Sequence, residues 1–271
     1  MKKNSFKGFS FYLLFLALVI SSCAKKGNPD KSIDTTNDFV VINNFTLDIF
    51  QQVDVISKKY QNGGNNPLNC SAMQVSGSND STYPKTVVAS FTYNCPGSFD
   101  QRKRDGTITV VFNGNPTQQD NVLDIAVENY KIENATINCT ASVTMVGINS
   151  DSAMIFNYKV SNGTIDYNGS VMSFGNDLFF EFTEGNETQN NYFDDEFLIS
   201  GTYFGSDGSG KPFSAEISNK LSKSFSCRWV KEGSVDVIPD DLFPRILDYG
   251  FGCDAVATAI IGFDQFDVNL P

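Results

Sequence analysis

Apolar residues near the start of the chain recur at the spacing of a helix. Steps of three or four residues separate Ile42, Phe45, Ile49, Val53, Ile56 and Tyr60, which is the period of one helical face. Asn37 or Asp38 can cap the start of such a helix, and Asn62-Gly63-Gly64 can end it. We therefore expect one amphipathic helix over residues 39–62, whose apolar face covers a sheet.

The rest of the chain, residues 63–271, has the pattern of strands. Short runs rich in β-branched and aromatic residues alternate with Gly, Asn and Asp turns. The clearest runs are Thr107 to Phe112, Val122 to Val127, Ala153 to Val160, Leu178 to Phe182, Phe197 to Phe204 and Phe213 to Ile217. No second helical pattern of comparable strength follows, so we expect one β-rich domain.

An internal repeat indicates how these strands are connected. Residues 129–147 align without gaps on residues 157–175, and nine of the nineteen positions are identical. Asn162-Gly163 in the second copy fits a two-residue hairpin turn, because both residues accept positive φ. The predicted fold is all-β, an antiparallel meander or sandwich built from repeated hairpins, with a β-solenoid as the alternative.

The first 22 residues have the layout of an export signal that is later removed. Lys2, Lys3 and Lys7 precede an apolar stretch of 12 residues, Phe9 to Ile20. A helix needs about 20 residues to cross a bilayer, so this stretch fits a signal peptide better than a permanent span.

The residues that follow the apolar stretch indicate lipidation. Ile20-Ser21-Ser22-Cys23 resembles the lipobox of bacterial lipoproteins, in which the cysteine thiol carries the lipid. Two acyl chains, such as palmitate, suffice for stable anchoring. We expect Cys23 to begin the mature chain and to hold it on a membrane, with residues 23–38 as a polar tether.

Composition excludes several classes of function. Without the signal, the chain contains 17 basic and 31 acidic residues. This excess of negative charge repels phosphate backbones and argues against nucleic acid as a partner. The chain has no histidine, which removes Ser-His-Asp catalysis and histidine-ligated metals. We expect no cofactor.

Five cysteines besides Cys23 would lie in an oxidising compartment. Cys70 and Cys95 are 25 residues apart around Pro84, and Cys227 and Cys253 are 26 apart around Pro244. This parallel predicts the disulfides Cys70–Cys95 and Cys227–Cys253, although unrelated buried thiols remain the alternative. Cys139 would then be a free thiol, buried because it lies between polar Asn138 and Thr140.

Several short motifs resemble a group of uncharacterised β-rich lipoproteins common in Bacteroidetes. The motifs are Tyr83-Pro84-Lys85, Arg104-Asp105-Gly106-Thr107-Ile108, Trp229-Val230-Lys231-Glu232-Gly233 and the run from Asp248 to Asp254. The resemblance implies a lipoprotein of the outer membrane but no activity. Ala24-Lys25-Lys26-Gly27 lacks the acidic surface-export signal of such bacteria, which favours a position facing the periplasm.

The remaining motifs give only weak indications of chemistry. Residues 205–212 have P-loop spacing, but Pro212 replaces the magnesium-binding hydroxyl, so we expect a hairpin turn. Asp248 and Asp254 are candidate calcium ligands, without a loop signature.

These observations favour a non-enzymatic cell-envelope lipoprotein that binds or scaffolds a glycan or an envelope protein. A glycan-active enzyme using two carboxylates and an adhesin or fimbria-like subunit that assembles by strand addition are the alternatives. The oligomeric state is left open by the sequence.

Overall fold

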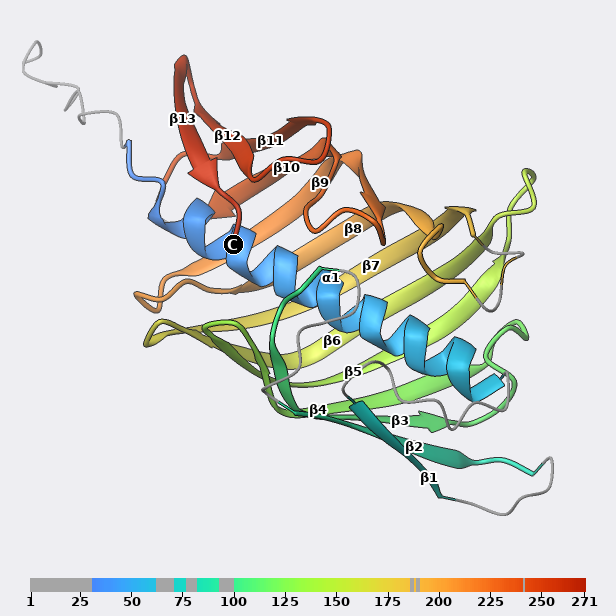
Figure 1. Ribbon diagram of the computed structural model, residues 1–271. Helices are drawn as coiled ribbons and strands as arrows, with labels where there is room; N and C mark the ends of the chain where they lie inside the picture. The colour runs from blue at the N-terminus through green and yellow to red at the C-terminus, as the bar shows by residue number, and fades with distance from the viewer. Residues whose placement is uncertain are drawn as a thin grey trace, which may run out of the picture. The chain divides into compact units, whose positions relative to one another are not determined.

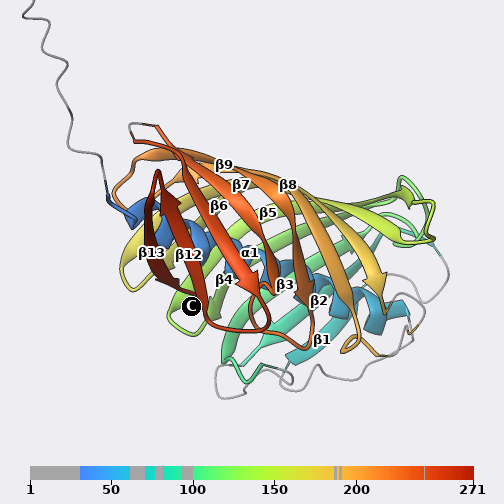
Figure 2. The ribbon, with the colours of Figure 1, turned by 90° about the horizontal axis from the view of Figure 1, so that it is seen from above.

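The computed structural model describes residues 31–61, 71–76, 82–92, 100–185, 188, 191–240 and 242–271. Within these residues, the unit from Ser32 to Pro271 contains one helix and one antiparallel sheet of 13 strands (Figures 1 and 2). Each strand pairs with the strands that precede and follow it in the chain. The predicted all-β class is confirmed, and the single meander is the form that the chain adopts.

The elements follow one another along the chain with short connections. Their bounds are α1 (Asp34–Gln61), β1 (Ser71–Ser76), β2 (Lys85–Phe91), β3 (Arg104–Phe112), β4 (Val122–Ile132), β5 (Ala135–Ile148), β6 (Met154–Tyr167), β7 (Ser170–Glu184), β8 (Glu196–Ser206), β9 (Pro212–Ser224), β10 (Glu232–Pro239), β11 (Arg245–Phe251), β12 (Val256–Ile261) and β13 (Asp264–Asn269).

Helix α1 lies along the hollow face of the curved sheet (Figure 1). The strands alternate buried and less buried residues, as in β2, where Val87, Ala89 and Phe91 are buried. Successive side chains of a strand point to opposite faces, so this alternation directs one apolar face of the sheet toward the helix. One apolar core joins residues of the helix to residues of the sheet.

Bulges at glycines accompany the curvature of the sheet. The register between β3 and β4 shifts beside Gly106, and that between β8 and β9 shifts beside Gly201. Both glycines have positive φ, and a Cβ atom at either would lie 2.1–2.2 Å from a carbonyl oxygen of the neighbouring strand. Only glycine fits there, and such bulges bend a strand and increase its twist.

The helix begins earlier than its apolar pattern predicts. It starts at Asp34 instead of residue 39, so the last five residues of the expected 23–38 tether are helical. The hydroxyl of Ser32 accepts a hydrogen bond from the backbone N–H of Asp34 at 3.3 Å. Ser32 therefore caps the helix, whereas the expected caps, Asn37 and Asp38, lie inside it.

The internal repeat does not correspond to repeated turns. Glu133-Asn134 forms the turn between β4 and β5, but Asn162-Gly163 lies within β6, and the turn to β7 is Asn168-Gly169. The prediction of a hairpin at Asn162-Gly163 is wrong. A Cβ atom at Gly163 would meet the ring of Phe174 at 2.3 Å, so this glycine gives space to a neighbouring ring.

Several predicted features fall outside the described residues, namely the signal peptide, Cys23, Cys70 and Cys95. Among the helical residues that the structure does describe, none form a segment with the length and hydropathy of a membrane span.

Candidate functional site

The polar side of α1 is buried, although an amphipathic surface helix would turn it to solvent. Asn43 donates a hydrogen bond to the hydroxyl of Tyr249 on β11 and accepts one from the hydroxyl of Tyr203 on β8, both at 2.6 Å. Asn44 donates to the backbone oxygen of the C-terminal Pro271 at 3.0 Å. These bonds hold distant parts of the chain against the helix.

A cluster of buried charges encloses the middle of the helix. The carboxylate of Asp48 binds Arg102 at 2.9 Å and Arg104 at 2.6 Å, and the hydroxyl of Tyr130 donates to it at 2.8 Å. Asp100 also pairs with both arginines, with its Oδ2 2.7 Å from Nη2 of Arg104. Two carboxylates thus balance two guanidinium groups, and residues 100–104 are tied to the helix.

The pKa values of Asp100 and Tyr130 are shifted by the charges around them. Burial works against ionisation of Asp100, but the hydrogen bond from Arg104 and the charge of Arg102 hold its pKa well below the usual range. Burial and the charge of Asp48 together raise the pKa of Tyr130. The carboxylate of Asp100 therefore stays ionised at ordinary pH, as expected for a buried ion pair with a structural role.

Lys223 at the end of β9 lies near this cluster. Its ammonium donates to the backbone oxygen of Ser224 at 3.1 Å and to that of Cys227. Burial, together with the charge of Arg102, lowers the pKa of Lys223 to about 7. This lysine is buried, and its hydrogen bonds join the chain after β9 to the interior.

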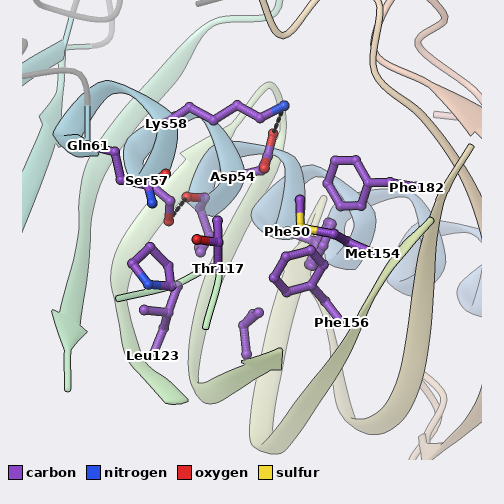
Figure 3. A pocket seen from close by; sticks show the side chains of 13 residues that line it. Phe50, Asp54, Ser57, Lys58, Gln61, Thr117, Leu123, Met154, Phe156 and Phe182 are labelled. Atoms are coloured by element: carbon purple, nitrogen blue, oxygen red, sulfur yellow. Dashed lines mark hydrogen bonds and ion pairs between the residues drawn. The ribbon is translucent and has the colours of Figure 1, made fainter. Parts of the chain in front are cut away.

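The structure contains an apolar pocket at the C-terminal end of α1, with a cavity volume of about 60 Å³ and a mouth open to solvent. Figure 3 shows Phe50, Met154 and Phe156 on one side and Leu123 and Thr117 on the other. The lining comes from the helix, from the loop between β3 and β4, and from β4 to β7. Its residues are Phe50, Val53, Asp54, Ser57, Lys58, Gln61, Pro116, Thr117, Leu123, Val143, Met154, Phe156 and Phe182.

One ammonium and two carboxyl groups stand at the edge of this pocket. Nζ of Lys58 lies 2.5 Å from Oδ2 of Asp195 and 3.4 Å from Oδ2 of Asp54. The same Nζ lies 5.3 Å from the centre of the Phe182 ring, which is within cation–π range. Asp54 and Lys58 line the pocket, whereas Asp195 is fully buried behind them.

The two carboxyl groups cannot both ionise easily beside a single lysine. Burial and the charge of Asp54 raise the pKa of Asp195 to about 8. Burial also raises the pKa of Asp54, against the opposing effect of Lys58. At neutral pH the carboxyl group of Asp195 is therefore largely protonated, and the charges that remain in the trio are those of the Lys58–Asp54 ion pair, which balance.

The pocket has the properties of a binding site for a small apolar molecule. Its walls are mostly apolar, and a few polar groups converge at one side, as in sites that fix the orientation of a ligand. Because the nearby charges balance, the site suits a ligand whose polar end is uncharged, such as a hydroxyl group.

The cysteines that the structure describes occupy the expected places. Cys227 and Cys253 form the predicted disulfide, with Cα atoms 5.8 Å apart. Cys139 is a free, buried thiol on β5, and burial raises its pKa to about 12. At this pKa the thiol stays protonated and unreactive.

The candidate calcium ligands stabilise turns. Asp248 accepts a hydrogen bond from the backbone N–H of Gly250 at 2.9 Å, and Asp254 accepts one from that of Val256 at 3.0 Å. In the described part of the chain, no three Asp, Glu or Cys side chains are grouped as a metal site requires. The P-loop-like segment is the turn between β8 and β9, as predicted.

Sequence reasoning missed both charged clusters on the helix. Asp48 and Asp54 interrupt the apolar pattern of α1 at positions that look solvent-facing, while Arg102, Arg104 and Asp195 lie far away in sequence. The one available signal was the density of charge from Asp100 to Asp105, which no local pattern could connect to the helix.

Comparison of the chain with protein-family models, with curated proteins and with solved structures gives no match.

Proposed function

We propose that this protein is a lipid-anchored lipoprotein of the outer membrane, facing the periplasm, that binds a small apolar or amphiphilic molecule. In this proposal Cys23 carries the lipid, and the pocket at the C-terminal end of α1 holds the ligand. The observation that carries the binding role is the apolar pocket with the near-neutral Asp54–Lys58–Asp195 trio at its edge.

A binding role agrees better with this geometry than a carboxylate-dependent hydrolase. Asp54 lines the pocket, but Asp195, the second carboxyl group beside Lys58, is fully buried and does not line it. An acid and a base must both reach the scissile bond. We therefore place this chain among non-enzymatic binding proteins, in keeping with its resemblance to β-rich lipoproteins.

The test uses the methyl group of Met154 as a reporter. Residues 23–271 with Cys23→Ser are labelled with ¹³C-methyl methionine and titrated with 1-octanol. We expect the Met154 signal to shift saturably, while those of Met73, Met145 and Met172, which do not line the pocket, stay in place.

A pair of adjacent variants controls this titration. Thr117 is exposed at the rim of the pocket, and Gln118 is exposed next to it but does not line it. Thr117→Trp should close the pocket and abolish the shift, whereas Gln118→Trp should leave it unchanged. The pocket is not a binding site if the Met154 signal does not shift with 1-octanol. The same conclusion follows if Thr117→Trp and Gln118→Trp have equal effects on the shift.

A further inference from the structure

Exposed apolar side chains gather at one end of the last four strands. Phe263 in the turn between β12 and β13 is fully exposed, and Phe243 in the connection between β10 and β11 is 63% exposed. Ile238 and Ile246 on the adjoining strands are each more than 40% exposed. We name these four residues the tether-end surface. Clusters of this kind on a protein surface mark sites of interaction.

Strand register brings these residues together. Arg245 at the start of β11 pairs with Val237 near the end of β10, so Ile246 and Ile238 are diagonal neighbours. On its other side Ile246 pairs with Ile260 of β12, three residues before Phe263. The β10–β11 connection, which carries Phe243, and the β12–β13 turn, which carries Phe263, therefore lie at the same end of the sheet (Figures 1 and 2).

The chain enters the folded unit at this same end. The buried guanidinium of Arg245 donates a hydrogen bond to the backbone oxygen of Ser32 at 2.9 Å and another to that of Phe243. One side chain thus holds the cap of α1 and the loop that carries Phe243. Cys23 precedes Ser32 by nine residues, which span at most about 30 Å when fully extended.

We propose that the tether-end surface rests on the bilayer that holds the acyl chains of Cys23. This inference depends on the lipid anchor of the proposed function and adds a second contact with the membrane. Two separate loops that end in aromatic rings suit insertion among lipids. Acidic Asp240 and Asp264 stand beside them, so the matching surface is one of zwitterionic headgroups.

This contact would orient the pocket. With its N-terminal end at the bilayer, α1 extends away from the surface through 28 residues, about 40 Å at 1.5 Å per residue. The pocket at its C-terminal end then lies away from the lipid, where it can take ligands from the aqueous phase.

Depth-dependent quenching of tryptophan tests this contact on the full acylated chain. The protein is reconstituted in phosphatidylcholine vesicles with brominated acyl chains, and each variant is compared with the parent chain to remove the signal of Trp229. We expect the added tryptophan of Phe263→Trp and of Phe243→Trp to lose most of its emission.

Phe251 provides a matched control. It is 86% exposed and lies at the opposite end of β11, about 20 Å from Arg245 by strand rise. The tryptophan of Phe251→Trp should keep its emission.

The possible failures are distinguishable. If the chain floats with the vesicles but the Phe263→Trp and Phe251→Trp variants are quenched equally little, the surface contact is wrong while the anchor stands. If the chain does not float, the anchor and the contact both fail. If the chain sediments as a dimer and Phe263→Ser makes it monomeric, the surface binds a second copy of the chain. This result would overturn the proposal.

Discussion

At the scale of single residues, Asp48 joins the middle of α1 to Arg102, Arg104 and Tyr130. It lies on the buried polar side of α1 and, together with Asp100, balances the charges of Arg102 and Arg104 at the start of β3. Removing one partner of a buried ion pair leaves charges that neither water nor protein compensates. The cluster explains why a helix with an acidic residue at its centre can be enclosed.

We expect Asp48→Ala to lower the free energy of unfolding by about 3–5 kcal/mol, because two guanidinium groups lose a buried partner. Urea denaturation measures the change. Asp124→Ala, at an exposed position of β4, is the control, with an expected effect on the free energy of unfolding within about 0.5 kcal/mol. A loss below about 1 kcal/mol for Asp48→Ala would contradict the role given to the cluster.

Individual residues were also the hardest feature to predict from sequence. Cys139 could be recognised as buried from its polar neighbours, and the Cys227–Cys253 bridge from its spacing. The prediction at Asn162-Gly163 was wrong because an Asn-Gly pair fits either a turn or a close packing contact. The contact with the ring of Phe174, which explains this glycine, cannot be seen in the local sequence. Asp48 and Asp54 gave no local signal, since their partners come from distant segments.

At the scale of elements, the last turns of α1 are bound to the start of β8 through Lys58 and Asp195. A carboxyl group whose pKa is higher in the folded state than the usual 3.8 stabilises the fold at low pH. That contribution is complete below about pH 4 and is lost as the pH rises through about 8, the pKa of Asp195. The junction should therefore weaken across this range.

Asp195→Asn should remove this dependence on pH. We expect the variant to melt several degrees above the parent chain at pH 8 and close to it at pH 4, because the amide stays neutral while Asp54 alone pairs with Lys58. Calorimetric scans at both pH values measure the difference. A difference that is the same at both would show that the carboxyl group of Asp195 is ionised throughout.

The elements themselves were largely predictable. Strand patterns anticipated the central part of the sheet, because period-two alternation follows directly from one buried face. The helix was recognised from its apolar side, but its early start depends on a cap at Ser32. The burial of the polar side of α1 could not be predicted, because the curvature of the sheet determines which residues contact Asn43, Asn44 and Asp48.

At the scale of the whole molecule, the sheet and helix form one body with two ends of different character. The start of α1 lies with the tether-end surface, and the end of α1 carries the apolar pocket. Sequence predicted the all-β class and left meander and sandwich open, since pairing between distant strands has no local signature. Neither the pocket nor the tether-end surface was foreseen, because both combine residues from several strands.

Attachment of the chain to a membrane through Cys23 is the premise of both the proposed function and the membrane contact. Intact mass spectrometry of the native protein tests this most directly. We predict a polypeptide that begins at Cys23 and carries the added mass of a diacylglycerol group. A chain that retains residues 1–22, or one that begins near Cys23 without any acyl group, would contradict the account.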